Sequence, residues 1–348
     1  MSVNKNCSYV YIYIVLLTAF ILFCTNVYGQ TEFTFMSYNC ENLFDTKHDD
    51  GKDDFAFLPE QMRRWNNKKL YQKLRNICKV ILATDSVRPV DIVCLLEVEN
   101  DSVMTFLTER TPLNRIGYDY VMTHSEDARG IDVAFLYSPF TFRLIEQRSI
   151  RIPSNRTRDI LYISGVVSNG DTLDVYGVHF PSNLSGAESL ALRNDVAEIL
   201  RDDIDSVMGY RLNPGVIVAG DFNDVAKSSL FRDKLSTVSA KDGVSETKGE
   251  EVLLYNLMDG REGGTYKYQG FWRIIDHILV SSRLMDRKSS ISCSYADAKI
   301  VTNSFLLEKD DIYGGMRPFR TYHGMKYQNG FSDHLPVFVR FRMNEKAF

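Results

Sequence analysis

Polar residues stand at the ends of several short apolar runs in this sequence. Glu97 ends the run DIVCLLE, His179 follows VYGV, and Asp221 follows VIVAG. Asp276 interrupts the apolar segment RIIDHILV, and Asp333-His334 directly precede another apolar run. Burying such side chains costs free energy unless they are paired or bind a metal ion. A single one could close a strand through a structural hydrogen bond, but this many at such positions indicate a shared site.

The residue types at these positions fit the hydrolysis of a phosphate ester. That reaction needs a cation at the phosphoryl oxygens, a group that orients or deprotonates water, and donors that neutralise the developing charge. Mg²⁺ prefers a few carboxylates and keeps several waters, so Glu97 and Asp333 are candidate ligands. The histidines lack the clustered cysteines or the HxH spacing of a zinc site.

Six segments give these residues a wider context. In this order along the chain, they resemble the endonuclease/exonuclease/phosphatase superfamily over nearly the whole sequence after residue 29. Each segment alone would match many unrelated proteins, but six in order, each at a strand end, are specific for the superfamily. The segments are MSYNCENLFD (36–45), LLEVEN (95–100), YGVHFPSN (176–183), AGDFND (219–224), IIDHILV (274–280) and FSDHLPV (331–337).

The resemblance implies a metal site. Glu97 would coordinate Mg²⁺, or Mn²⁺ or Ca²⁺ in its place, and Asn39 would hold the metal or its waters from the adjacent strand. Asp333 would lie in the metal-side carboxylate group. Without the other motifs, Asn39 would be equally plausible as a turn residue at a strand end.

The resemblance also implies catalytic roles. Asp221 would orient and deprotonate the attacking water, and Asn223 would position that water or a phosphate oxygen. His179 and His334 would contact the phosphate on opposite sides, and Asp276 would accept a hydrogen bond from His334 and fix its orientation. Interior histidines with purely structural partners are the alternative for both imidazoles. His277 should face the opposite side of its strand and is interpreted as structural; the remaining residues kept outside the catalytic set are His48, His124, Asn183 and His323.

Hydrophobic periodicity predicts the elements that would position these residues. Apolar residues on one helical face predict a helix over about residues 64–83. A second helix is expected to begin at Ser185, whose spacing to Glu188 is that of a capping box. The β-rich segments between residues 118 and 179 are expected to form consecutive hairpins. Further strands are predicted at residues 33–38, 91–97, 215–221, 271–280 and 335–341, with long irregular stretches at 236–264 and 302–330.

The fold class expected from this pattern is α/β. The resemblance implies a four-layered α/β-sandwich with two packed mixed β-sheets flanked by helices. Residues 30–348 are expected to form one domain and a monomer. Cys40, Cys78, Cys94 and Cys293 have no CxxC spacing, so buried free thiols are expected rather than zinc ligands or a disulfide framework.

Residues 1–29 have the pattern of a signal peptide. Lys5 precedes an apolar run from Val10 to Cys24, and Val27 and Gly29 suit the −3 and −1 positions of a cleavage site. The run is shorter than the ~20 residues of a membrane span, so no span is expected after cleavage. Export to the periplasm, the cell surface or the medium is predicted; an uncleaved anchor helix and a lipoprotein acylated at Cys24 are the alternatives.

The motifs leave the phosphate ester open. Residues 30–348 hold 40 Lys and Arg against 45 Asp and Glu, a net charge of −5, which argues weakly against tight non-specific DNA binding. A basic cluster at residues 63–75 is interpreted as a solvated helix face, whereas the arginines at residues 143–158 could flank a phosphate backbone. Aromatic residues at 266–272 offer stacking surfaces. A nuclease is the leading hypothesis; the alternatives are a phosphodiesterase or phosphatase acting on lipid or small phosphate esters, such as a sphingomyelinase, and a non-catalytic binding protein.

Overall fold

The computed structural model describes residues 31–182, 186–243 and 253–344. The predicted signal peptide, Asn183 and Ser185 lie outside these ranges. Within them, no helix is both long enough and apolar enough to cross a membrane. The cysteines Cys40, Cys78, Cys94 and Cys293 are buried with free thiols, as predicted.

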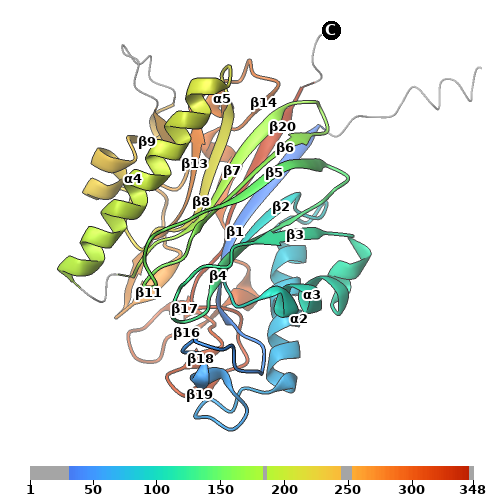
Figure 1. The fold of residues 1–348 in the computed structure, drawn as a ribbon, viewed down its shortest axis with the longest axis vertical. Helices are drawn as coiled ribbons and strands as arrows, with labels where there is room; N and C mark the ends of the chain where they lie inside the picture. Colours follow the sequence, from blue (N-terminus) through green and yellow to red (C-terminus); the bar gives the residue numbers. More distant parts are fainter. Residues whose placement is uncertain (1–30, 183–185, 244–252, 345–348) are drawn as a thin grey trace, which may run out of the picture.

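Two large mixed β-sheets form the centre of the molecule (Figure 1). In the first sheet, β1 and β2 are parallel and β1 and β20 antiparallel; in the second, β7 and β8 are parallel and β8 and β13 antiparallel. The first sheet has the order β14 (Ile291–Ser292), β20 (Val337–Met343), β1 (Glu32–Leu43), β2 (Ile92–Val98), β4 (Asp132–Tyr137) and β3 (Asp119–Met122), with β15 (Ala298–Ile300) also paired to β20. The second has the order β5 (Phe142–Ile150), β6 (Ile160–Val167), β7 (Thr172–His179), β8 (Gly215–Asp221), β13 (Asp276–Ser281), β10 (Leu254–Asn256) and β9 (Thr237–Ser239).

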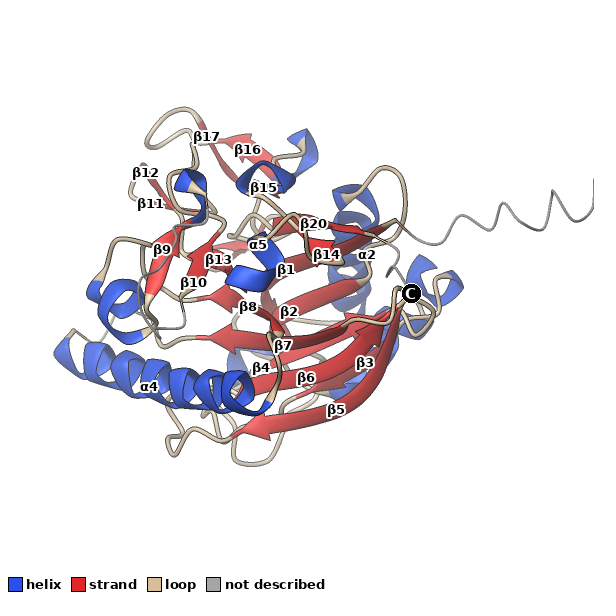
Figure 2. Cartoon of the chain, turned by 90° about the horizontal axis from the view of Figure 1, so that it is seen from above, coloured by secondary structure: helices blue, strands red, loops and turns tan. Residues whose placement is uncertain are grey.

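Helices cover the outer faces of both sheets (Figure 2). Helices α2 (Asn67–Thr84) and α3 (Asp101–Glu109) pack on the first sheet, and α4 (Ala187–Tyr210) packs on the second. A short helix, α5 (Ser282–Met285), follows β13. Along β1, Phe35 faces the second sheet and Met36 faces the helices, because neighbouring side chains of a strand point to opposite faces. The predicted four-layered sandwich is confirmed.

In the described part of the chain, three small hairpins lie outside the two sheets. They are β11 (Tyr266–Tyr268) with β12 (Phe271–Arg273), β16 (Leu307–Lys309) with β17 (Met316–Pro318), and β18 (Tyr322–His323) with β19 (Lys326–Tyr327). The strand predicted over residues 271–280 is therefore wrong: it divides at Ile274–Ile275 into β12 and β13, which belong to different sheets. The stretch 302–330 is not wholly irregular either.

Other local predictions are partly wrong for reasons of tertiary packing. Strands β4 and β5 are not a hairpin, because the chain crosses between the two sheets there. Helix α4 begins after Gly186, and no side chain caps it there. Helix α3 is short and escaped prediction. Lys73, assigned to a solvated face, is buried, and its ammonium group donates to the Phe331 carbonyl at 2.7 Å.

Candidate active site

Strand register brings the polar strand ends together. His179 at the end of β7 is the register partner of Asp221 at the end of β8, and Asp221 is in turn the partner of Asp276 at the start of β13. In the facing sheet, Asn39 on β1 pairs with Leu96 on β2, so Glu97 is the next residue along. Residues as distant in the sequence as Asn39 and Asp221, which are 182 positions apart, therefore meet at one end of the sandwich.

The Asp221 carboxylate lies at the centre of this group. Its Oδ2 atom accepts a hydrogen bond from the Asn39 side-chain amide at 3.2 Å. The same atom is 3.7 Å from Nε2 of His179 and 3.8 Å from Nε2 of His334. Burial raises the pKa of the Asp221 carboxyl to about 7, and the negative charges of Asp276 and Glu97 add to this effect. Asp221 can therefore exchange a proton near neutral pH.

His334 is held by a carboxylate and by the chain around it. Its Nδ1 atom is 2.8 Å from Oδ2 of Asp276. The buried Ser332 hydroxyl accepts a hydrogen bond from the His334 backbone N–H and donates one to the Asn39 carbonyl at 2.7 Å, which fixes the segment before β20 against β1 of the same sheet. Burial alone would lower the pKa of His334, but the carboxylates of Asp276 and Asp221 outweigh it and hold the pKa well above its usual value. The imidazole is therefore protonated at neutral pH.

His179 has the opposite electrostatic setting. Burial, followed by the positive charges of Arg158 and Arg129, holds the pKa of His179 well below its usual value, so the ring is neutral. Its Nε2 atom is 4.0 Å from Oε1 of Glu97, and its Nδ1 atom has no hydrogen-bond partner within the described residues. The two histidines thus differ in charge although both are buried beside Asp221.

Several residues at the site have strained backbones. Glu41, Asn42, Glu97 and Asn223 have φ angles of 52°, 59°, 60° and 50°, in the left-handed region that side-chain-bearing residues rarely adopt. The backbone N–H of Asn42 donates to Oε2 of Glu97 at 2.8 Å, which fixes that carboxylate. Such conformations persist where the surrounding structure holds them in place, and they cluster at functional sites.

Oxygen atoms suited to a divalent cation lie beside Asp221. Glu97 lines the pocket beside Asp221, and its other oxygen, Oε1, is the one near His179. The Asn39 amide oxygen keeps a second lone pair, although it already accepts a hydrogen bond from the Glu41 N–H at 2.9 Å. Asp333 lines the same pocket, but its Oδ2 atom is engaged by Arg320 at 2.8 Å. Carboxylate and amide oxygens are the donors that Mg²⁺ and Ca²⁺ prefer, so these residues fit a hard cation.

A second grouping of possible ligands is better explained by hydrogen bonding. Asp221, Asp276 and His334 offer ligand atoms that all lie within 4.8 Å of one another. The Nδ1 atom of His334, however, is already bonded to Asp276. We therefore interpret these three residues as a proton-transfer chain rather than as a metal-binding triad.

Asn223 supports Asp221 from the loop after β8. Its backbone N–H donates to Oδ1 of Asp221 at 2.8 Å, and its side-chain amide donates to the Phe180 carbonyl at 3.0 Å. Both contacts hold the strand end where Asp221 is located. Asn223 also lines the pocket beside Asp221.

A pocket of about 660 Å³, called here the catalytic pocket, is lined by most of the site residues: Glu97, His179, Asp221, Asn223, Asp333 and His334. One flank of it, called here the arginine flank, contains Arg129, Arg156 and Arg158. Arg129 is on one loop and the other two arginines are on a second loop, and a hydrogen bond from the Ala128 N–H to the Asn155 carbonyl joins the two loops. Arg158 is 5% exposed, lies 3.6 Å from Asp127, and its Nε has no hydrogen-bond acceptor among the described residues. Arg156 and Arg158 belong to the arginine cluster noted in the sequence, whereas Arg129 carried no sequence signal.

The remaining histidines lie outside the catalytic pocket. His277 is buried between Asn256 and the Asp224 carbonyl, as its structural interpretation requires. His48 bonds to Asp54, and His124 lies 3.4 Å from Asp101. His323 lines a different pocket.

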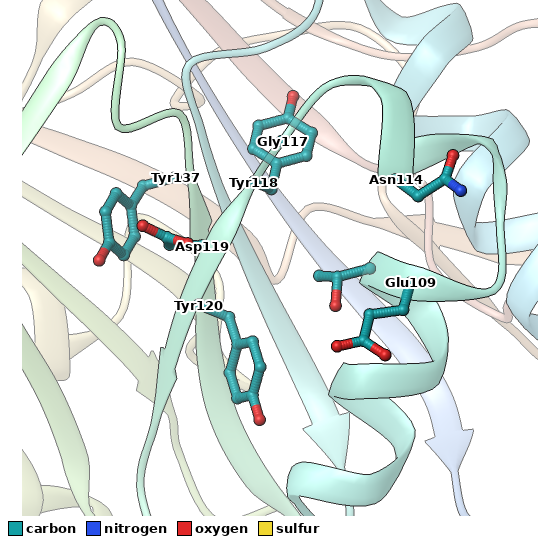
Figure 3. Close-up of a pocket in the computed structure, with 8 residues that line it drawn as sticks. Glu109, Asn114, Gly117, Tyr118, Asp119, Tyr120 and Tyr137 are labelled. Atoms are coloured by element: carbon teal, nitrogen blue, oxygen red, sulfur yellow. The ribbon is translucent and has the colours of Figure 1, made fainter.

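A separate pocket near α3 and β3 contains Glu109, Asp119, Tyr120 and Tyr137 (Figure 3). Tyr137 pairs with Ile92 at the beginning of β2, whereas Glu97 is near the end of that strand. This pocket therefore lies at the opposite end of the strands from the catalytic pocket. Its lining contains carboxylates but no histidine, lysine or arginine, so it lacks the positive and imidazole groups that the catalytic pocket offers to a phosphate.

The site thus combines a buried carboxylate between two imidazoles with oxygen atoms that fit a divalent cation, and phosphoester hydrolysis uses groups of these types. The chain belongs to the endonuclease/exonuclease/phosphatase family, whose sequence model matches residues 34–343. Members of this family are phosphoesterase hydrolases and generally depend on a divalent metal.

Individual relatives are distant. The chain is 22% identical over 242 residues to the protein angel of Drosophila melanogaster, covering 65% of this chain and 62% of the relative. Among solved structures, a mannosyl-6-phosphatase of Bacteroides thetaiotaomicron superposes with a TM-score of 0.55 at 18% identity, over 89% of this chain and 99% of that one. A humanised D. rerio TDP2 gives 0.55 at 16%, over 90% and 100%. These similarities support the fold.

Proposed function

We propose that the chain is a Mg²⁺-dependent phosphodiesterase that cleaves nucleic acid by in-line attack of water. The observation that carries this proposal is the buried Asp221 carboxylate, which has Nε2 of His179 at 3.7 Å and Nε2 of His334 at 3.8 Å. A phosphate placed between the two imidazoles would have a proton acceptor and two donors around it. Those are the groups that hydrolysis of a phosphodiester requires.

Asp221 would accept the proton of the attacking water. A pKa of about 7 matches this role, because a general base works best when its pKa is near the pH of the reaction. The Asn39 amide and the Asn223 backbone N–H each donate to one of its oxygens, so the carboxylate is held in one orientation. Asn223 would also position the water or a phosphate oxygen.

The two histidines would bind the phosphate in different charge states. Protonated His334 would neutralise a phosphoryl oxygen or donate a proton to the leaving oxygen, and Asp276 would keep it charged and oriented. Neutral His179 would donate a hydrogen bond through Nε2. This division follows from the carboxylates around His334 and the arginines beside His179.

Glu97 and Asn39 would hold the cation, with Asp333 on the same side. Mg²⁺ fits two or three oxygen ligands because it usually keeps several waters, and Mn²⁺ or Ca²⁺ could take the same donors. When bound, a cation at this position polarises the phosphoryl oxygen and offsets charge that develops during hydrolysis.

The arginine flank supports nucleic acid over a choline lipid. Arg129, Arg156 and Arg158 place positive charge beside the position of the scissile phosphate, where a further backbone phosphate would be attracted. The quaternary ammonium of a choline headgroup would be repelled by the same charges. The segment 1–29, with its apolar run and cleavage-site residues, supports export of the enzyme from the cytoplasm.

Purified residues 30–348 test the activity directly. We expect cleavage of plasmid DNA or RNA and of bis(p-nitrophenyl) phosphate with Mg²⁺, loss of activity in EDTA, and no release of phosphocholine from sphingomyelin. Asp221→Asn should lower the rate by ~10²-fold or more while the melting temperature is kept, as expected for loss of a general base. Full activity of this variant would contradict the proposal, and inactivity of the wild type on every ester would favour a binding protein.

Two arginines provide a matched pair for the substrate class. Arg156 lines the catalytic pocket, whereas Arg151 is an exposed arginine nearby that pairs with Glu126 and lies outside that pocket. Arg156→Ala should raise KM for nucleic acid. It should also reduce the slope of log K against log salt concentration by about one, because one fewer counterion is released on binding. Arg151→Ala should leave both unchanged. Equal effects of the two variants would remove the argument for a phosphate backbone on this flank.

A further inference from the structure

A second pocket adjoins the catalytic pocket. It has a volume of about 360 Å³ and shares Tyr266, Tyr268 and Asp333 with the catalytic pocket. Its walls are the β11–β12 hairpin and the segment that connects β16 and β17, which lie side by side in Figure 2. Because the two pockets have these walls in common, a ligand bound at Asp221 and His334 can extend into the second pocket without leaving the protein surface.

The walls of this second pocket are fixed to each other. Lys267 on β11 donates to Oδ2 of Asp310 and to the Gly314 carbonyl, both at 2.8 Å. The Lys267 and Asp310 side chains are 5% and 3% exposed, so the ion pair is buried. Gly270, in the turn after β11, has a φ of +87°, and a Cβ atom there would lie 3.0 Å from Cβ of Tyr313. The hairpin and the opposite segment are therefore in close contact at two points.

The same hairpin is joined to the catalytic histidine. Tyr266 forms an antiparallel bridge with His334, and the two rings have centroids 4.9 Å apart. The Leu335 N–H donates to the Thr265 carbonyl at 2.7 Å. The second pocket thus has a fixed position relative to the site where a phosphate would react.

The chemistry of the second pocket differs from that of the arginine flank. Each of its Lys and Arg side chains already has a carboxylate partner: Lys267 has Asp310, Arg317 has Glu308, and Arg320 has Asp333, all at 2.8 Å. The flank arginines also have carboxylate neighbours, but at longer distances: Arg156 lies 3.0 Å from Glu188, Arg158 lies 3.6 Å from Asp127, and Arg129 lies 4.0 Å from Glu97. Positive charge is therefore more closely balanced in the second pocket, and a second phosphate gains less there. The most exposed side chains of this pocket are instead apolar or aromatic: Ile312 is 64% exposed, and the aromatic residues Tyr268 and Tyr313 are 48% and 56% exposed. Such rings bind a flat, uncharged ring by stacking.

We propose that the second pocket is a nucleobase subsite, in which Tyr268 and Tyr313 stack against the base next to the scissile phosphate. This inference rests on the proposed function as a nucleic acid phosphodiesterase. The volume lies within the range of small-molecule sites, and the phosphate and base would occupy two pockets with a common wall. The arginine flank would take the next backbone phosphate on the other side. Substrate preference would then depend on the base at this one position.

Binding to a catalytically inactive protein tests the subsite. In the Asp221→Asn background with Mg²⁺, calorimetry would measure Kd for a dinucleotide and for two analogues, each lacking one base. We expect one of the two analogues to bind more weakly. Tyr313→Ala should raise Kd for the intact dinucleotide about 5- to 150-fold, the range for loss of one stacking partner. It should leave Kd unchanged for the weaker-binding analogue, because that analogue lacks the base that Tyr313 would contact. Tyr313→Phe, which keeps the ring, should bind like the parent.

Phe271 provides the matched control. Phe271 is on the β11–β12 hairpin, like Tyr268, and is 72% exposed, but it lines neither the catalytic pocket nor the second pocket. Phe271→Ala should leave dinucleotide binding unchanged. Binding to phosphatidylcholine vesicles provides a further test. If Phe271→Ala and Tyr313→Ala both abolish vesicle binding and neither affects the dinucleotide, the exposed aromatic residues of this region contact a lipid surface and the subsite is overturned. The subsite is also overturned if the dinucleotide does not bind, or if Tyr313→Ala weakens the intact and base-free ligands equally.

The two proposals can fail separately. Cleavage of nucleic acid by the wild type with no Tyr313 dependence would leave the function standing and remove the subsite. Tyr313-dependent binding of the dinucleotide, without cleavage of DNA or RNA, would leave the subsite standing and remove the activity.

Discussion

Oδ2 of Asp276 lies 2.8 Å from Nδ1 of His334, although the two residues are 58 positions apart and belong to different layers of the sandwich. Asp276 begins β13 of the second sheet, and His334 precedes β20 of the first. The contact therefore exists only when the two sheets are packed correctly. The charge state of His334 therefore depends on the packing of the two sheets, because that packing places Asp276 beside it.

Asp276→Asn should test that link. We expect kcat to fall about 10²- to 10⁴-fold, because an amide neither charges nor orients the imidazole as a carboxylate does. Asp276 helps to hold the pKa of His334 above its usual value, so the variant histidine should lose its proton at a lower pH. If protonated His334 is the active form, activity is lost as pH rises through its pKa, and this alkaline loss should move to lower pH. An unchanged pH–rate profile would contradict the role given to His334.

Glu97→Gln should weaken metal binding without unfolding the protein. Removing the negative charge leaves only neutral or Arg-paired oxygens at the cation position, so the Mg²⁺ concentration for half-maximal activity should rise by roughly 10-fold or more. Mg²⁺ titration of the hydrolysis rate and calorimetry on the protein alone would both measure this. Glu109→Gln, at the pocket in Figure 3, should need no additional Mg²⁺. A wild-type protein fully active in EDTA would exclude the metal site.

Glu99 should make stability depend on pH. Burial, with the nearby Asp45, Asp49 and Asp54 charges, raises its pKa from 4.5 to about 9, although the Asp45 N–H partly opposes this. The folded state thus binds a proton that the unfolded state releases above pH 4.5. The contribution of Glu99 to stability is complete below its unfolded pKa and is lost as pH rises towards 9.

Glu99→Gln, which resembles the protonated acid, should therefore change little at pH 5 and stabilise the protein at pH 8 by at least ~1 kcal/mol. Urea unfolding at the two pH values measures the difference. Exposed Glu60→Gln is the control and should show no such pH dependence. A Glu99→Gln protein that is less stable than the wild type at pH 8 would show that the carboxylate is charged in the folded state.

Gly220→Ala should disrupt the strand end that carries Asp221. Gly220 has a φ of +152°, and a Cβ atom there would lie 1.8 Å from the Val178 carbonyl oxygen of the neighbouring strand. Because backbone cannot move aside cheaply, we expect a loss of about 3 kcal/mol or more, or an insoluble protein. Gly209→Ala in helix α4, where a Cβ atom meets nothing within 4 Å, should instead stabilise by about 0.5–1 kcal/mol. Thermal unfolding would measure both.

The sequence by itself determined where the polar strand ends lie. Glu97, His179 and Asp221 each follow an apolar run, and such runs are local patterns that specify buried strands whatever their neighbours are. The family motifs then ordered these residues into one site. The α/β class could be predicted for the same reason, because helical and strand periodicities are local properties of the chain. The layered sandwich was implied only by the family resemblance.

Tertiary structure alone decided the partners and the surroundings of these residues. Nothing near Arg129 in the sequence places it beside His179, because two loops must first join across a backbone hydrogen bond. The strand predicted at 271–280 is wrong because residues 266–273 turn back as a separate hairpin, and the buried ion pair of Lys267 with Asp310 fixes that hairpin from 43 residues away. Such contacts depend on how loops of different sheets pack, and no local pattern encodes that packing.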